Sequence, residues 1–260
     1  MPYNLNLPLL LQKPMPNDTD QRANLDLGLL LCDDVPKEGR ARFGDYAGMF
    51  ERAIKAVDKN VRLTPYHAFV SELPNAPGDH EGYLISGSAA SVFEDHQWIR
   101  DTMAFVRRCR DARVPMVGIC FGHQLIAHAL GGETVRSENG WGFGIHSARL
   151  CSNPDWVDAD SPEFKLIVIH QDQVESLPPG FTTLASNDFC PHSMITDNDI
   201  MLGIQGHPEF GKDYCAYRAE ARRERIGEAK YQETLELLAN NETNSSMVFG
   251  WISNFLRRAA

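Results

Sequence analysis

Short apolar runs alternate with amphipathic segments along most of the chain. The apolar runs predict buried strands at residues 25–32, 61–70, 83–85, 114–117, 145–151, 164–169, 182–186, 193–196 and 200–205. Apolar residues at helical spacing predict helices at residues 45–57, 94–110 and 125–130. This alternation predicts an α/β fold with a mostly parallel, doubly wound sheet and helices on both faces. Binding sites in such folds lie beyond the carboxyl ends of the strands.

A few residues indicate where these elements begin, end or bend. Asp45 is a good N-cap for the helix that follows it. Pro65 cannot donate a backbone hydrogen bond, so its strand should lie at a sheet edge or carry a bulge. Residues 33–39 contain two aspartates, a proline and a glycine, and we expect a loop there.

The chain divides into three predicted parts. Residues 1–24 are proline-rich and polar without a period, which predicts an N-terminal arm, and residues 25–240 form one α/β domain. Residues 241–260 begin with a polar linker and continue as a helix that packs on or beside the domain, because its apolar residues recur at i, i+3, i+4 and i+7: Val248, Trp251, Ile252 and Phe255. The charged segment after Lys212 predicts solvated helix faces, and its charged residues include Arg218, Glu220, Arg222, Arg223, Glu224 and Arg225.

Composition narrows the possible partners and the compartment. The 260 residues carry a formal net charge of −10, which argues against nucleic acid or an anionic membrane surface as the main partner. No apolar stretch approaches membrane-spanning length, and the N-terminus lacks the basic region and cleavage site of a signal peptide. The six scattered cysteines indicate free thiols in a reducing compartment, so we expect a cytoplasmic protein.

The most informative stretch is GICFGHQ at residues 118–124. An apolar strand precedes it and a short helix follows, so Cys120 lies in a G-x-C-x-G sequence at a strand-to-helix junction. This is the pattern of a nucleophile elbow, in which glycines allow a sharp turn that exposes the nucleophile. The helix N-terminus also favours a thiolate. The alternative, an inert buried cysteine, would not require the two flanking glycines.

A nucleophilic cysteine needs a base, and the base needs an orienting group. GHPEF at residues 206–210 follows another predicted strand, and residues two apart in an extended segment point the same way. We therefore predict His207 as the base and Glu209 as its partner. His170 is a competing candidate, but it lacks a carboxylate in the same arrangement.

These two motifs resemble the signatures of class I, triad-type glutamine amidotransferases, and ISGS at residues 85–88 resembles a third. The resemblance covers roughly residues 25–225 and is nearest to stand-alone members similar to the GMP synthetase glutaminase domain and the γ-glutamyl peptidases. It implies a flavodoxin-like fold and a triad of Cys120, His207 and Glu209. It also implies an oxyanion hole formed by the N–H groups of Gly87 and Phe121.

The resemblance further implies a substrate pocket at the segment after the strand at residues 164–169. Gln124, His170, Gln171 and Asp172 are the predicted substrate-binding residues, and we expect residues 170–174 to form a polar loop that closes the pocket. No spacing typical of a metal site is present, and we expect neither a metal nor another cofactor. The glycines at residues 140–144 do not fit a dinucleotide-binding spacing.

Three functions are compatible with these residues. The first is hydrolysis or transfer of the γ-glutamyl group of glutamine or of a γ-glutamyl amide or peptide through a cysteinyl thioester. The second is a glutaminase subunit that supplies ammonia to a separate synthetase in trans. The third is a catalytically idle binding or scaffold protein, against which the complete set of site residues argues.

Overall fold

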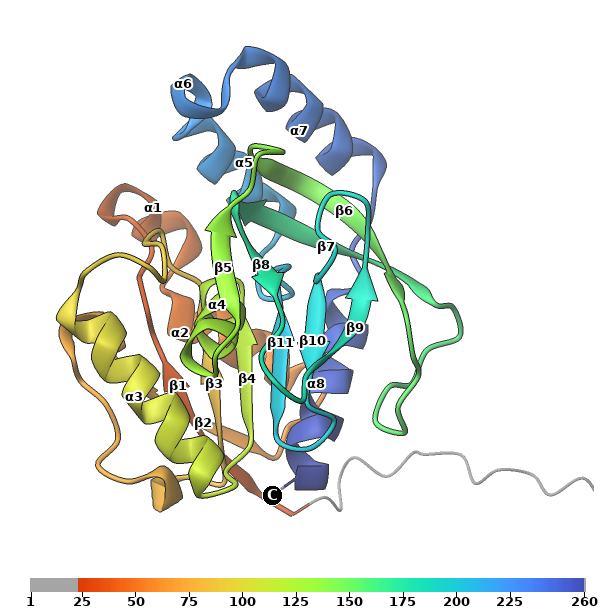
Figure 1. Ribbon diagram of the computed structural model, residues 1–260. Coiled ribbons are helices and arrows are strands. Elements are labelled where there is room, and N and C mark those ends of the chain that lie inside the picture. The colour runs from red at the N-terminus through yellow and green to blue at the C-terminus, as the bar shows by residue number, and fades with distance from the viewer. Residues whose placement is uncertain (1–22, 260) are drawn as a thin grey trace, which may run out of the picture.

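A nine-stranded sheet forms the centre of the protein, seen in a computed structural model that describes residues 23–259 (Figure 1). The strands are β1 (Leu25–Leu30), β2 (Val61–Tyr66), β3 (Gly82–Ile85), β4 (Met116–Ile119), β5 (Glu133–Arg136), β6 (Gly142–Leu150), β7 (Glu163–His170), β8 (Asp172–Ser176), β9 (Thr182–Ser186), β10 (Met194–Thr196) and β11 (Met201–Ile204). The large sheet has the order β2-β1-β3-β4-β11-β10-β9-β6-β7, and β5 pairs with β8 in a separate small sheet.

Strand direction divides the large sheet into two halves. The strands β2, β1, β3, β4 and β11 are all parallel to their neighbours, whereas each step from β11 to β7 is antiparallel. Within this sheet only β10 and β6 therefore run against the other strands. The prediction of an α/β fold with a mostly parallel sheet is confirmed. β2, which contains Pro65, is an edge strand, as the proline predicts.

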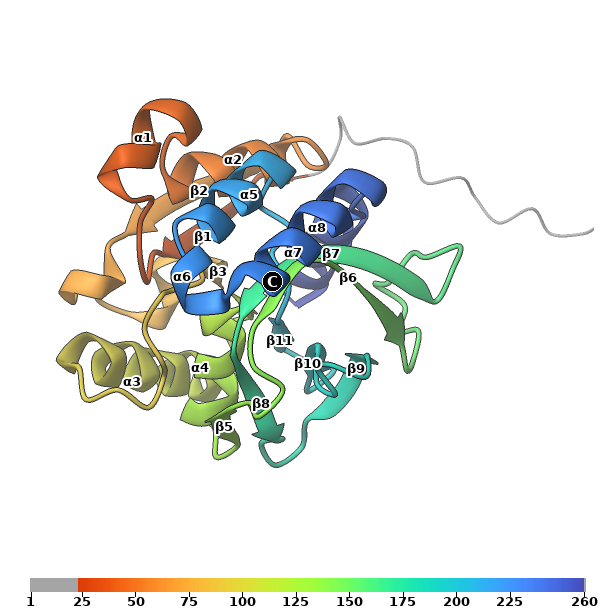
Figure 2. The ribbon, with the colours of Figure 1, turned by 90° about the horizontal axis from the view of Figure 1, so that it is seen from above.

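Helices cover both faces of the sheet. They are α1 (Lys37–Phe43), α2 (Tyr46–Lys55), α3 (Gln97–Asp111), α4 (Phe121–Ala129), α5 (Lys212–Glu220), α6 (Arg223–Ile226), α7 (Glu228–Asn240) and α8 (Ser245–Ala259). Figure 2 shows α3 and α4 on one side of the parallel strands and α2 and α8 on the other. The carboxylate of Asp45 caps α2 by accepting a 2.7 Å hydrogen bond from the N–H of Gly48. The segment α5–α7 lies beyond the carboxyl ends of the strands (Figure 1).

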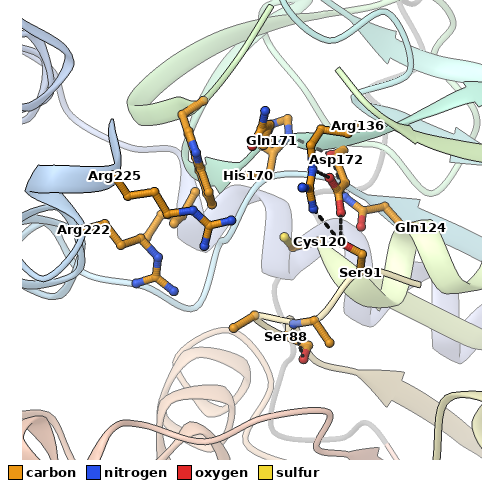
Figure 3. Close-up of a pocket in the computed structure, with 14 residues that line it drawn as sticks. Ser88, Ser91, Cys120, Gln124, Arg136, His170, Gln171, Asp172, Arg222 and Arg225 are labelled. Carbon is orange, nitrogen blue, oxygen red and sulfur yellow. Dashed lines mark hydrogen bonds and ion pairs between the residues drawn. The ribbon is translucent and has the colours of Figure 1, made fainter. Parts of the chain in front are cut away.

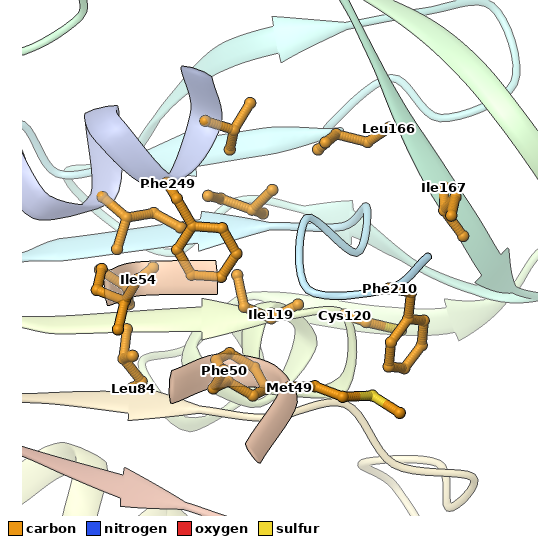
Figure 4. Close-up of a cluster of buried hydrophobic side chains, with 14 of the residues drawn as sticks. Met49, Phe50, Ile54, Leu84, Ile119, Cys120, Leu166, Ile167, Phe210 and Phe249 are labelled. Carbon is orange, nitrogen blue, oxygen red and sulfur yellow. The ribbon is translucent and has the colours of Figure 1, made fainter. Parts of the chain in front are cut away.

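The larger core lies between the sheet and the helices α2 and α8 (Figure 4). Phe50 and Ile54 from α2 meet Phe249 from α8, and the rings of Phe50 and Phe249 pack edge to face with centroids 6.4 Å apart. Leu84 and Ile119, from the central strands, lie in the same cluster and are fully buried. This packing fixes β4, and with it the strand end that leads into α4.

The helix α8 belongs to this core. Trp251 is buried, and its indole N–H donates a 2.8 Å hydrogen bond to the carbonyl of Asp158. Arg257 donates to the buried carboxylate of Asp58 through Nε (2.6 Å) and Nη2 (3.0 Å). The predicted amphipathic helix therefore packs on the domain through its apolar face. The predicted domain boundaries remain a prediction, and nearly all of the predicted arm lies outside the described residues.

Two segments differ from the expectation. Residues 170–174, predicted as a loop, instead contain the start of β8, which pairs with β5 in the small antiparallel sheet. Strand pairing with a segment 36 or more residues away overrides the polar composition there. Residues 37–39, predicted as part of a loop, form the first turn of α1, and Pro36 occupies its N-cap position. Within the described residues no helix is long and apolar enough to cross a membrane.

The role of α8 leads to a stability prediction. Trp251→Ala should lower the free energy of unfolding by about 3–5 kcal/mol, because it removes a fully buried ring and leaves a cavity. Gly250→Ala is the matched control in the same helix, since a Cβ there meets no atom within 4 Å. It should change stability by less than about 1 kcal/mol. Urea denaturation measures both, and equal values for the two variants would show that α8 is not part of the core.

Candidate active site

Cys120 occupies the turn between β4 and α4. Its backbone has φ 53° and ψ −100°, a conformation that non-glycine residues rarely adopt. The surrounding structure must hold such a residue in place, and strained backbones of this kind cluster at functional sites. The predicted elbow geometry is therefore present at the predicted residue.

The two glycines that flank Cys120 permit close backbone approaches. A Cβ on Gly118 would lie 2.2 Å from the carbonyl oxygen of Gly122, and a Cβ on Gly122 would lie 2.5 Å from the carbonyl oxygen of Ile85. Real Cβ atoms do not come so close to backbone atoms. The glycines thus let α4 pack directly against β4 and β3, and this packing forces the sharp turn at Cys120.

His207 lies beside Cys120 because β11 is the parallel neighbour of β4. The N–H of Cys120 donates to the carbonyl of Ile204 (2.8 Å), and the N–H of His207 donates to the carbonyl of Ile167 (2.7 Å). The His207 Nδ1 lies 2.7 Å from the Glu209 Oε1. The side chains of His207 and Cys120 both lie beside Gly87, and Cys120 contributes to the raised pKa of the imidazole. Since Nδ1 is bonded to Glu209, Nε2 is the ring nitrogen left for the thiol. The imidazole of His207 therefore contacts the Glu209 carboxylate directly and lies near Cys120.

Two neighbouring residues restrict the position of the His207 imidazole. The ring of Phe210 stacks on it with centroids 4.2 Å apart and planes inclined by 11°. On another side, a Cβ on Gly87 would lie only 2.9 Å from the His207 Cε1. Any larger residue at position 87 would therefore push the ring. Phe210 lies in the motif at residues 206–210, but its stacking role was not predicted.

The charge state of His207 depends on opposing effects. Burial disfavours the charged ring, but the charges and hydrogen bonds of Glu209 and Cys120 outweigh it and raise the pKa of His207 to about 10. The side chains of His207 and Glu209 are only 5 % and 1 % exposed, so water screens this attraction little. Imidazolium is thus the favoured form of His207 at neutral pH.

The other cysteines lie in different environments. Burial raises the pKa of the Cys109, Cys190 and Cys215 thiols to about 12, and it raises the pKa of Cys32 as well. These four thiols are poor nucleophiles at neutral pH. Cys151 is exposed.

Gly87 and Phe121, the predicted oxyanion-hole residues, both lie next to Cys120. Gly87 follows β3, and Phe121 is the first residue of α4, where backbone N–H groups have no helical partner. Among the described residues, no hydrogen-bond acceptor is found for either N–H. Both N–H groups therefore keep their hydrogen-bonding capacity.

A pocket opens in front of Cys120, and the four predicted substrate-binding residues line it (Figure 3). The side-chain amide of Gln124 donates to the carbonyl of Asp172 (2.7 Å) and to the Gln205 Oε1 (3.1 Å). Gln124 thereby ties α4 to β8 and fixes the wall of the pocket. His170 and Gln171 come from the end of β7 and the residue after it.

His170 differs from His207 in its surroundings. Its Nδ1 lies 3.1 Å from the carbonyl oxygen of Asp172, so Nδ1 carries the proton in this contact. Burial lowers the pKa of His170 to about 3, and among the described residues its Nε2 has no hydrogen-bond partner. A ring with so low a pKa and no carboxylate partner is a weak base.

The carboxylate of Asp172 belongs to a network that the sequence did not indicate. It accepts hydrogen bonds from the hydroxyl of Ser91 and from the Nε of Arg136 (3.2 Å), and Arg136 Nη2 donates to the Ser91 oxygen (3.2 Å). Figure 3 shows these bonds on one side of the pocket. The partners are 81 and 36 residues from Asp172, so no local pattern could have indicated them.

Two of the arginines predicted to lie on solvated faces, Arg218 and Arg222, are buried or half-buried instead, whereas Arg225 is exposed. Arg218 is buried, and its Nη1 donates to the hydroxyl of Tyr214 (3.0 Å). Arg222 and Arg225 line the pocket with Cys120, on the side opposite Asp172 (Figure 3). The fold of α5 and α6 over the strand ends brings Arg222 and Arg225 to the edge of the pocket. Within the described residues, no group of three or more His, Cys, Asp or Glu residues could hold a metal ion.

Comparisons with known proteins agree with this geometry. The family model for glutamine amidotransferase class-I matches residues 43–213. γ-Glutamyl peptidase 3 of Arabidopsis thaliana is 33 % identical over 202 residues, which cover 75 % of this chain and 80 % of the peptidase. A glutamine-hydrolyzing GMP synthase subunit of Saccharolobus solfataricus is 29 % identical over 167 residues, which cover 64 % of this chain and 85 % of the synthase subunit.

A crystal structure of a glutamine amidotransferase from Thermotoga maritima has the same fold. It superposes with a TM-score of 0.72 at 19 % identity and covers 92 % of this chain and 99 % of its own. At this identity the likeness concerns the fold alone. Because the family model covers more than half of the 260 residues and the plant peptidase matches three quarters of them, the chain belongs to the class I glutamine amidotransferase family.

Proposed function

We propose that this protein hydrolyses, or transfers, the γ-glutamyl group of glutamine or of a γ-glutamyl amide or peptide, through a thioester on Cys120. The observation that carries the proposal is the strained backbone of Cys120 with its thiol against the imidazole of His207, itself bonded to Glu209. A buried thiol–imidazole–carboxylate series is the arrangement that nucleophilic acyl transfer requires.

In the first step, the thiolate of Cys120 attacks the δ-carbonyl carbon of the γ-glutamyl group. The carbonyl oxygen becomes an oxyanion, which the N–H groups of Gly87 and Phe121 stabilise, and each such donor contributes about 3 kcal/mol to the barrier reduction. His207 gives the proton on Nε2 to the departing nitrogen as the C–N bond breaks. The products are a glutamyl thioester and ammonia or an amine.

In the second step, water attacks the thioester carbonyl. His207, now neutral, accepts the proton of that water, and the C–S bond breaks to release glutamate and restore the thiolate. An amine in place of water would give transfer. Glu209 stabilises the imidazolium that forms in each cycle and fixes the ring, and both effects follow from its 2.7 Å contact with Nδ1.

The Gln124 side of the pocket provides a place for the glutamyl group. Gln124, His170, Gln171 and Asp172 all line the space in front of Cys120. The α-amino and α-carboxylate groups of a γ-glutamyl substrate need polar partners of both signs, and this wall has backbone as well as side-chain groups to offer. We assign these four residues to substrate binding on that basis.

A second candidate, a glutaminase subunit that passes ammonia to a synthetase in trans, has support from the similarity to the GMP synthase of Saccharolobus solfataricus. The similarity to γ-glutamyl peptidase 3 supports the first candidate, at higher identity over a longer segment. The third candidate, an idle scaffold, gives no reason for a strained cysteine beside a charged, buried histidine.

An assay of the purified chain alone separates the first two candidates. We expect release of glutamate from γ-glutamyl peptides, γ-glutamyl amides or glutamine, followed together with the amine or ammonia. Cys120→Ala protein is the control and should be inactive at unchanged thermal stability. Activity that requires a second protein and ATP would instead support the second candidate, a glutaminase subunit that supplies ammonia to a synthetase.

Substitutions at the two partners of the thiol should differ in effect. His207→Ala should lower kcat by roughly 10⁴-fold or more, whereas Glu209→Gln should be less severe by roughly tenfold to a hundredfold. Glu209→Gln should also lower the pKa of His207, since it removes the carboxylate that opposes the effect of burial. In the wild type, this raised pKa stabilises the fold fully below the unfolded value of 6.5, and the stabilisation disappears as the pH rises through about 10.

NMR titration of the imidazole signals measures that pKa, and His170→Gln is the matched control variant. His170 has no carboxylate partner, so its replacement should leave the titration of His207 in place. A loss of kcat in His170→Gln as large as that in His207→Ala, with the fold intact, would show that the base is His170.

A further inference from the structure

Two arginines without a counter-charge face the same pocket as Cys120. Arg222 follows α5 and Arg225 lies in α6, and both line the pocket on the side away from Asp172 (Figure 3). The chain as a whole has a net charge of −10, so a local pair of positive side chains beside the nucleophile runs against the general composition. Both arginines also line a neighbouring open hollow, and Arg225 is exposed, so the pair lies at the edge of the pocket.

Other arginines in this region differ from Arg222 and Arg225, because they form ion pairs with carboxylates. Arg136, on the opposite wall, is paired with Asp172, and Arg223 is paired with Glu228 at 2.7 Å. Among the described residues, no carboxylate lies within ion-pair distance of Arg222 or Arg225. Arg222 is half-buried, and burial together with the charge of Arg218 lowers the pKa of its guanidinium. A half-buried cation in this position is stabilised if an anionic ligand binds there.

An aromatic side chain helps to place the pair. The guanidinium carbon of Arg225 lies 4.9 Å from the centroid of the Trp141 ring, and Trp141 also lines the pocket. This cation–π contact holds Arg225 over the pocket without neutralising its charge. The hydrogen-bonding capacity of both guanidinium groups remains available to a ligand, and their planar forks match a carboxylate.

We propose that Arg222 and Arg225 bind a carboxylate carried by the leaving group, so that the substrates are γ-glutamyl peptides with a free carboxylate rather than glutamine. This inference rests on the proposed γ-glutamyl chemistry at Cys120. The position of the two arginines indicates that they contact the leaving group. The polar wall of Gln124 and Asp172 lies on one side of the thiol, and the arginines lie on the other (Figure 3). An acyl group and its leaving group must extend in different directions from the carbon that the thiol attacks.

A γ-glutamyl peptide carries two carboxylates that the arginines can bind. One belongs to the leaving group, and the other is the α-carboxylate of the glutamyl group. γ-Glutamylglycine and γ-glutamylglycinamide distinguish them, because they differ only in whether the leaving group carries a carboxylate or a neutral amide. The quantity to measure is the ratio of their kcat/KM values. We expect wild-type protein to prefer γ-glutamylglycine, and Arg222→Gln/Arg225→Gln protein to show a ratio lower by about tenfold or more.

Arg223→Gln is the matched control, because it removes the same charge from the same segment at a residue paired with Glu228. It should leave the ratio at its wild-type value. An equal loss of kcat/KM for both substrates in the double variant would place the arginines on the glutamyl α-carboxylate and overturn the inference. A ratio that does not change, or an equal fall in the control, would overturn it as well.

A binding experiment separates failure of this inference from failure of the proposed function. If wild-type protein hydrolyses neither these two compounds nor glutamine, the proposed function is wrong. Calorimetry with the Cys120→Ala protein still measures the Kd of both compounds, and the arginine substitutions should weaken binding of γ-glutamylglycine more than that of γ-glutamylglycinamide. Equal weakening, or none, would overturn the assignment of the two arginines.

Discussion

The packing of α4 directly onto the ends of β3 and β4 is the constraint on which the site depends. It requires backbone contacts so close that Gly118 and Gly122 admit no Cβ, and it leaves Cys120 with a positive φ. Such a conformation costs of order 1–3 kcal/mol, which the surrounding core must supply. The core between the sheet and the helices α2 and α8 does so, because its buried side chains hold β4 on the opposite face.

The site also depends on the charge of His207, which burial disfavours and neighbouring groups favour. An imidazolium in a buried position would be strongly disfavoured alone, yet the Glu209 carboxylate and the Cys120 side chain raise the pKa of His207 to about 10. The parallel pairing of β11 with β4 brings these charges together, and the stacked ring of Phe210 keeps the imidazole aligned. The charges therefore reinforce one another only while the sheet register is kept, which couples the proposed chemistry to the fold.

Local patterns predicted the central elements because those elements carry their information within a few residues. The glycines around Cys120 and the spacing of His207 and Glu209 are of this kind, as are the apolar runs of the central strands. The β8 strand and the network of Asp172 with Arg136 depend on partners far along the chain. Arg222 was predicted to lie on a solvated face, since charge alone does not indicate that α5 and α6 fold over the strand ends. The roles of Cys120, His207, Glu209, Gly87 and Phe121 remain predictions that the geometry supports.

The most direct test of the account is the identification of the acylated residue during turnover. Protein mixed with a γ-glutamyl substrate and quenched rapidly in acid can be digested and mapped by mass spectrometry. A hydroxylamine-sensitive glutamyl adduct is expected on the peptide that contains Cys120. Turnover that persists in Cys120→Ala protein, or an adduct on another residue such as the exposed Cys151, would contradict it.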